Sequence, residues 1–100
     1  KTSGNYFIGN IGVNEFEQQL GFSLFPNPTV GEFRVQFEMS QREVAEVEIV
    51  NAIGQVIFKR DYNLSTGLNT LTINPETAAG IYFLRFKIGE DQLVRKFRVE

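Results

Sequence analysis

Short runs of alternating apolar and polar residues, separated by turn residues, fill the chain from Phe22 onward. In "EFRVQFE", residues 32–38, the apolar Phe33, Val35 and Phe37 recur at every second position, so they share one face of an extended strand. Runs of this kind are typical of antiparallel sheets that bury one face. The pattern predicts strands over residues 22–25, 32–38, 44–51, 55–62, 68–74, 80–88 and 92–100.

One of these runs departs from simple alternation. "GIYFLRFKI", residues 80–88, is apolar on both faces over much of its length. This indicates either a central strand covered on both sides or a strand that offers its outer face to a partner. We adopt coverage on both sides as the prediction.

No long helical period accompanies the strands, and "PETAA", residues 75–79, is read as a turn or a single helical turn. The predicted fold class is therefore all-β, a seven-stranded antiparallel immunoglobulin-like β-sandwich. Residues 22–100 form this domain. Residues 1–21 contain four glycines and three asparagines without a sustained period, which predicts a linker. A strand over residues 5–13 that docks on the domain edge is the alternative.

Charge and hydropathy exclude two classes of protein. Lysine and arginine total 10, aspartate and glutamate total 12, and no block of cations is longer than two residues, so the charge pattern of a nucleic-acid binder is missing. No apolar run approaches the roughly 20 residues that span a bilayer. If the protein is exported, we expect its signal peptide to lie outside this stretch of chain.

The inventory of reactive side chains offers no active site. The sequence has no cysteine and no histidine, so the usual nucleophile and base pairs cannot be built. Asp61 and Asp91 stand in no calcium-loop pattern. Glu46 and Glu48 share one face of a strand, either as an acid pair or as a solvated charged surface, and we expect the latter. We therefore predict no enzyme, no metal and no cofactor.

The stretch "FSLFPNPTVGEF", residues 22–33, is an unusual entry into a β domain. Pro26 and Pro28 lack the N–H that a sheet ladder needs, and each favours an extended conformation in the residue before it. Asn27 can cap the turn with its side chain. By itself this predicts only a proline-stiffened exit from an edge strand.

Four blocks of the sequence, taken in order, resemble blocks of one known family. "LFPNPTVGEFRV" resembles the opening of the C-terminal sorting domain of type IX secretion cargo proteins, in its type A variety (the Por secretion system family). "VEIVNAIGQVIF", "TAAGIYFLRF" and "LVRKFRVE" resemble its central strands and turn glycine, its Gly-x-Tyr block and its basic last strand. The resemblance covers residues 22–100. Many members end in a lysine-rich tip, whereas this sequence ends with Arg98, Val99 and Glu100.

The resemblance implies a non-catalytic secretion signal. The domain would direct an N-terminally attached cargo through the outer-membrane type IX translocon, after export to the periplasm, to the cell surface or the medium. A sortase-like peptidase would remove it by cutting within residues 1–21. The sorting-motif residues implied in this way are Phe25, Pro26, Asn27, Pro28, Gly31, Gly54, Gly80, Tyr82, Arg95, Lys96, Phe97, Arg98 and Val99.

The last strand suggests how a translocon could read the domain. Arg95, Lys96 and Arg98 surround the apolar Phe97, a composition suited to docking by edge pairing plus charge. These cations could instead simply keep an edge strand solvated. Gly80 and Tyr82 are expected to serve the fold, and self-association through residues such as Ile57, Ile81 or Phe83 stays open.

The rival function is a passive accessory module, either carbohydrate-binding or a fibronectin-like spacer. It would use the same sandwich, so the fold alone does not separate the two. A sugar binder favours exposed aromatic rows, whereas this sequence has no tryptophan and only three dispersed tyrosines. The residues therefore favour the sorting signal.

Overall fold

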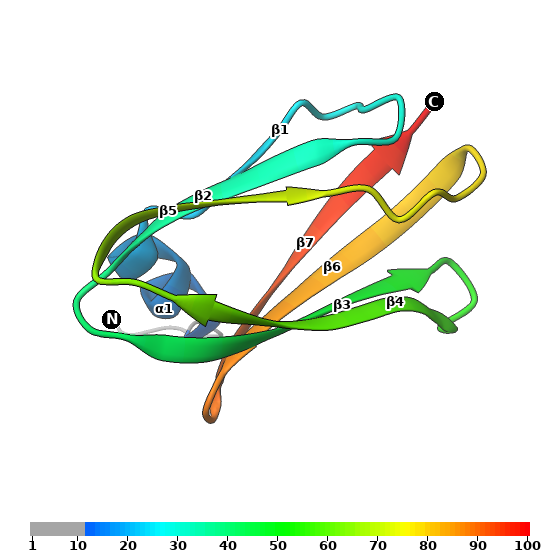
Figure 1. Cartoon of the computed structure of the whole chain (residues 1–100). Helices are drawn as coiled ribbons and strands as arrows, with labels where there is room; N and C mark the ends of the chain where they lie inside the picture. The colour runs from blue at the N-terminus through cyan, green and yellow to red at the C-terminus, as the bar shows by residue number, and fades with distance from the viewer. Residues whose placement is uncertain (1–11) are drawn as a thin grey trace, which may run out of the picture.

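Two antiparallel sheets make up the domain in a computed structural model that describes residues 12–100 (Figure 1). The three-stranded sheet has the order β1-β2-β5, with β1 Ser23–Phe25, β2 Phe33–Met39 and β5 Gly67–Ile73. The four-stranded sheet has the order β4-β3-β6-β7, with β4 Val56–Leu64, β3 Glu43–Asn51, β6 Gly80–Ile88 and β7 Asp91–Val99. A helix, α1 Gly12–Leu20, precedes them.

All pairings between these strands are antiparallel, and the chain passes from one sheet to the other after β2, β4 and β5. This is a seven-stranded sandwich of the immunoglobulin-like kind, which confirms the predicted fold class. The observed strands differ from the predicted ranges by at most two residues at either end. The strands could be predicted because their apolar positions repeat with the period of a strand.

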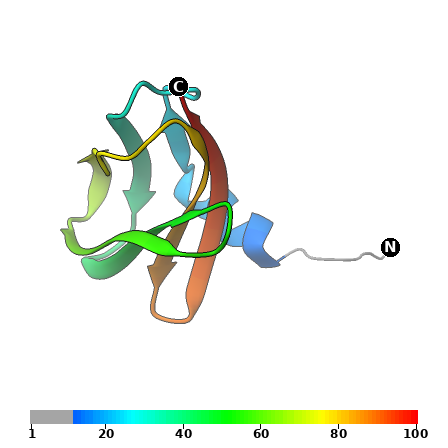
Figure 2. The ribbon, with the colours of Figure 1, turned by 90° about the vertical axis from the view of Figure 1, so that its right-hand side faces the viewer.

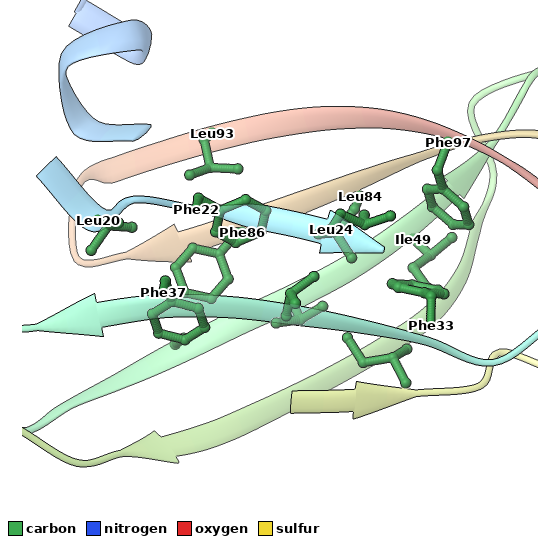
Figure 3. Packing of buried hydrophobic residues seen from close by; sticks show 14 of the residues in the cluster. Leu20, Phe22, Leu24, Phe33, Phe37, Ile49, Leu84, Phe86, Leu93 and Phe97 are labelled. Atoms are coloured by element: carbon green, nitrogen blue, oxygen red, sulfur yellow. The ribbon is translucent and has the colours of Figure 1, made fainter. Parts of the chain in front are cut away.

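Phenylalanine fills the space between the sheets (Figure 3). At one end of the sandwich the ring of Phe86 lies 5.2 Å from that of Phe22 and 4.8 Å from that of Phe37, measured between centroids. At the other end the rings of Phe33 and Phe97 are 4.7 Å apart. The two sheets are thus joined by aromatic pairs at both ends, with aliphatic side chains between them.

The prediction that residues 80–88 are covered on both sides is wrong. β6 is central in its sheet, and its inward residues Tyr82, Leu84 and Phe86 are buried. On the outer face, however, Ile81 is 36% exposed and Phe83 is half-buried. No other element of residues 12–100 covers this face, so the alternative of an open surface for a partner remains.

The linker predicted over residues 1–21 contains a helix where the structure describes it. In α1 the side chain of Phe16 packs against the core, and Leu20, one turn later on the same face, is buried. In the sequence, Val13, Phe16 and Leu20 have the i, i+3, i+7 spacing of a helix, but three apolar residues in so short a stretch did not outweigh the surrounding glycines and asparagines, which is why the helix was not predicted. Of the alternative strand over residues 5–13, only 12 and 13 are described, and they are helical.

Helix α1 closes the sandwich beside β7 (Figure 2). It is nine residues long, and nowhere in residues 12–100 is there a helix long and apolar enough to span a membrane.

Candidate functional site

The Pro-Asn-Pro segment lies along the edge of β7, far away in sequence. We call residues 26–29 the clasp. The Asn27 side chain accepts a hydrogen bond from the backbone N–H of Arg98 at 3.1 Å and donates one to the carbonyl of Lys96 at 3.4 Å. Both views of the ribbon show the end of β7 beside this connection between β1 and β2 (Figure 1, Figure 2). The peptide bonds before Pro26 and Pro28 are both cis.

Thr29, the last residue of the clasp, forms a parallel bridge to Val99. Its backbone N–H donates to the Arg98 carbonyl at 2.9 Å, and its own carbonyl accepts from the Glu100 N–H at 2.8 Å. Prolines have no N–H, so Asn27 and Thr29 are the two residues of the clasp that have a backbone donor. The clasp therefore pairs with the outer edge of β7 as a short added strand.

The Thr29 side chain holds the clasp together from within. It is 1% exposed, and its hydroxyl donates to the carbonyl of Glu32 at 2.6 Å while accepting from the N–H of Gly31 at 3.1 Å. Thr29 is not among the motif residues predicted from the sequence. A signal was present, because a threonine hydroxyl can bond the backbone two residues further on and so cap a turn that contains a glycine.

The three cations predicted to act together on β7 do not share one face. The Arg95 guanidinium forms an ion pair with Glu17 of α1, donates to the carbonyl of Phe22 at 3.2 Å and lies 5.5 Å from the centroid of its ring. Lys96 and Arg98 are exposed on the outer face of the sheet. Successive side chains of a strand alternate between its faces, so Arg95 fastens α1 while the other two remain in solvent.

Phe97 and Val99 belong to the core rather than to an exposed docking surface. Phe97 is 1% exposed and stacks on Tyr82 with 5.9 Å between ring centroids. The Tyr82 hydroxyl donates to the carbonyl of Ala78 at 2.6 Å, and a Cβ added to Gly80 would contact its ring at 3.7 Å. These four motif residues, Gly80, Tyr82, Phe97 and Val99, pack one end of the sandwich.

The remaining motif residues lie in connections. Phe25 ends β1 with 38% of its surface exposed, and Gly31 follows the clasp. Gly54 has a φ of +91° in the turn between β3 and β4, a conformation that favours glycine. Asn51 braces that turn by accepting hydrogen bonds from the N–H groups of Ile53 and Gln55, at 3.2 Å and 2.9 Å. Asn51 is not among the motif residues predicted from the sequence.

The clasp changes the predicted mode of docking. The outward backbone groups of Arg98 and Glu100 and the carbonyl of Lys96 already have partners in Asn27 and Thr29. An incoming strand cannot pair with these groups unless the clasp leaves. Edge pairing at residues 96–100, expected from the sequence, therefore conflicts with the folded structure.

Glu46 and Glu48 form a solvated charge ladder on the outer face. Lys59 lies 3.1 Å from Glu46, and Arg85 lies 3.2 Å from Glu48. The hydrogen bond that Lys59 donates to Glu46, followed by the charges of Glu46 and Glu48, raises the pKa of Lys59 above its ordinary value. Each carboxylate thus has a cation beside it. Within residues 12–100 there is no group of three or more His, Cys, Asp or Glu side chains placed to hold a metal.

An immunoglobulin-like sandwich whose first connection is hydrogen-bonded to its last strand is the class of domain that these contacts define. The sequence model described as "Secretion system C-terminal sorting domain" matches residues 23–100. The chain belongs to this family, and the domain is a C-terminal type IX secretion sorting signal. Domains of the family are in general not catalytic. They act with the type IX secretion machinery on an attached N-terminal cargo, which is exported to the cell surface or secreted.

Among solved structures the similarity is weak. A β-glucosidase from Kluyveromyces marxianus is 19% identical, with a TM-score of 0.44 over 81% of this chain and 14% of that one. A β-glucosidase from Listeria innocua in complex with isofagomine is 14% identical, with a TM-score of 0.45 over 78% of this chain and 16% of that one. The chain thus spans a small part of either enzyme, and scores this low carry no information on function. No curated protein matches the chain.

Proposed function

We propose that this domain carries an N-terminally attached cargo from the periplasm through the outer-membrane type IX translocon, and that a sortase-like peptidase then removes it. The cargo is thereby displayed on the cell surface or released. The observation that supports this most strongly is the family match over residues 23–100. The same match disfavours a carbohydrate-binding or spacer module.

The contacts of the clasp fit a signal that is read in the folded state. Asn27 and Thr29 join the first connection of the sandwich to residues 96–100, across about seventy residues of sequence. These bonds form only when the whole domain has folded, because they link its two ends. A partner that recognises the assembled surface would therefore accept completed domains only.

We place the cut before helix α1. A peptidase acts on extended backbone, whereas residues 12–20 are helical and tied down by Phe16, by Leu20 and by the ion pair between Glu17 and Arg95. Of the linker predicted over residues 1–21, this leaves residues 1–11 as the segment that the peptidase cuts. The removed domain would keep α1.

A fusion tests both parts of the proposal. Residues 1–100 are placed behind a signal peptide and a fluorescent reporter, expressed in a strain with the type IX machinery, and the cells are fractionated. We expect reporter at the surface or in the medium, and a released domain whose mass places its N-terminus at or before Gly12. The reporter without the domain is the negative control, and an established sorting domain is the positive control.

Two results would contradict the proposal separately. Reporter retained uncleaved in the periplasm, while the established sorting domain delivers it, would remove the sorting function and favour the spacer module. Delivery with a cut inside residues 13–21 would keep the sorting function but overturn the position of the cut.

A further inference from the structure

The outer face of β6 and β7 has a regular chemical pattern. Three successive cross-strand pairs each join one apolar and one cationic side chain. These pairs are Ile81 with Arg98, Phe83 with Lys96, and Arg85 with Val94. Directly opposed side chains on one face of a sheet lie about 5 Å apart, so each of the three pairs places an apolar group next to a positive charge. Along the strands, Ile81 and Phe83 follow one another on β6, and Lys96 and Arg98 follow one another on β7. We call these six residues the mixed face; β6 and β7 lie side by side in Figure 1.

Two of the three cations of the mixed face have no ion-pair partner within residues 12–100, whereas Arg85 is paired with Glu48. Lys96 and Arg98 are exposed and form no ion pair with any residue in 12–100. The neighbouring carboxylates of Glu46 and Glu48 are already occupied by Lys59 and Arg85. The face therefore has an excess of positive charge beside exposed apolar groups.

A hollow at one side of the mixed face could receive an apolar group. It has a volume of about 360 Å³ and is lined by Val50, Ala52, Gly54, Phe83, Arg85 and Val94, together with Asn51. Val94 is 43% exposed at its border, and the turn glycine Gly54 keeps the other side low because it has no side chain. The hollow brings Gly54, a predicted motif residue, next to the strand pair that carries Lys96 and Arg98.

The inner face and the outer edge of β7 already contact other parts of the domain. Its inner face is in the core through Leu93, Phe97 and Val99, and its outer edge near residues 96–100 is paired with the clasp. We propose that the mixed face is the surface read during sorting, and that it docks a translocon surface that carries carboxylates beside apolar side chains. This inference rests on the proposed function and gives that function a location and a partner chemistry.

Charge complementarity favours such a partner over a second copy of this chain. From β3 and β4, on the same side of its own sheet, a copy offers Glu46 and Glu48, which are already ion-paired, and Asp61, whose charge acts on Lys59. Breaking those pairs to form equivalent ones between copies gains little. An external acidic surface gains the full attraction of Lys96 and Arg98 and is steered to them.

Charge reversal in the fusion assay tests the inference. Lys96→Glu/Arg98→Glu reverses two exposed charges. The matched control, Arg34→Glu/Arg42→Glu, makes the same change in net charge at exposed positions elsewhere. We expect surface delivery of the reporter to fall about tenfold or more for the first pair, the range that electrostatic steering contributes, and to change little for the second. Thermal unfolding of the purified domains establishes that both variants fold.

A second pair of variants tests the hollow by placing either a negative or a positive charge at Val94. Val94→Asp places a carboxylate against the acidic partner, whereas Val94→Lys adds a cation at the same exposed position. We expect delivery to fall clearly further for Val94→Asp than for Val94→Lys. A structural role for Val94 alone would lower both to a similar extent.

The outcomes separate the two levels of the proposal. If the unchanged domain fails to deliver the reporter, the proposed function and this inference both fall. If the unchanged domain delivers it and Lys96→Glu/Arg98→Glu does so equally, only the inference falls. A dimer of the unchanged domain in sedimentation that Lys96→Glu/Arg98→Glu disperses would also overturn it, in favour of a second copy as occupant.

Discussion

The two edges of the four-stranded sheet are protected in different ways. At β7 the chain covers its own edge, with the clasp paired to residues 96–100 and α1 packed beside the strand. At β4, the other edge, residues 12–100 supply no such cover, and three consecutive charged residues, Lys59, Arg60 and Asp61, lie exposed at the middle of the strand. Exposed charge is a common way to keep a bare edge from pairing with another chain.

This difference indicates where the domain tolerates change. The β7 edge depends on buried groups and on hydrogen bonds between distant segments, each of which leaves unpaired atoms or a cavity when removed. The β4 edge depends on side chains that are already in water. Substitutions should therefore have large effects near β7 and small ones near β4.

The largest expected effect compares the same residue type at the two edge strands. Phe97→Ala on β7 should lower the free energy of unfolding by about 3–5 kcal/mol, because it opens a cavity beside Phe33 and Tyr82. Phe58→Ala on β4 should lower it by less than half as much, because that ring is only partly buried. Urea unfolding measures both, and equal losses would remove the distinction between the edges.

An intermediate effect is expected inside the clasp. Thr29→Val keeps the shape of the side chain but leaves the Glu32 carbonyl and the Gly31 N–H without their partner, which should lower the free energy of unfolding by about 1–3 kcal/mol. The amides of Arg98 and Glu100 should also exchange faster with solvent, because the clasp pairs with them.

Thr72→Val is the matched control for this change. Thr72 is exposed on β5, and its substitution should stay within about 0.5 kcal/mol of the unchanged domain. If the amides of Arg98 and Glu100 exchange with solvent as slowly in Thr29→Val as in the unchanged domain, the Thr29 hydroxyl does not hold the clasp.

The smallest effect is expected at β4. The pKa of Lys59 is raised above 10.5 by the hydrogen bond that it donates to Glu46 and by the charges of Glu46 and Glu48, so the charged form favours folding. That contribution is fully present below pH 10.5 and is lost as the pH rises through the higher pKa of the folded state. Lys59→Gln should thus be slightly less stable than the unchanged domain near neutrality.

The comparison between the two proteins is made by urea unfolding at neutral pH and again at about pH 11 or above, where lysines lose their charge. The difference in free energy of unfolding should shrink between these conditions. A difference that stays the same would mean that Lys59 acts through packing rather than through its charge.

Much of the sandwich could be predicted from short-range pattern. Phe33, Val35 and Phe37 alternate with polar residues, and Leu93, Phe97 and Val99 keep the same phase on β7. Burial of one face of a strand imposes this period directly on the sequence, so strand positions follow from it. The order of the four quoted blocks was likewise sufficient to indicate the family that matches residues 23–100.

The tertiary structure alone decided which distant groups meet. Asn27 and Arg98 are 71 positions apart, and Glu17 and Arg95 are 78 apart. No local period records such pairs, because they depend on how the two sheets and α1 pack together. The sequence by itself thus determined the strands, the inward residues and the family. Only packing decided that Asn27 and Thr29 pair with β7, that Arg95 turns toward α1, and that Lys96 and Arg98 face solvent.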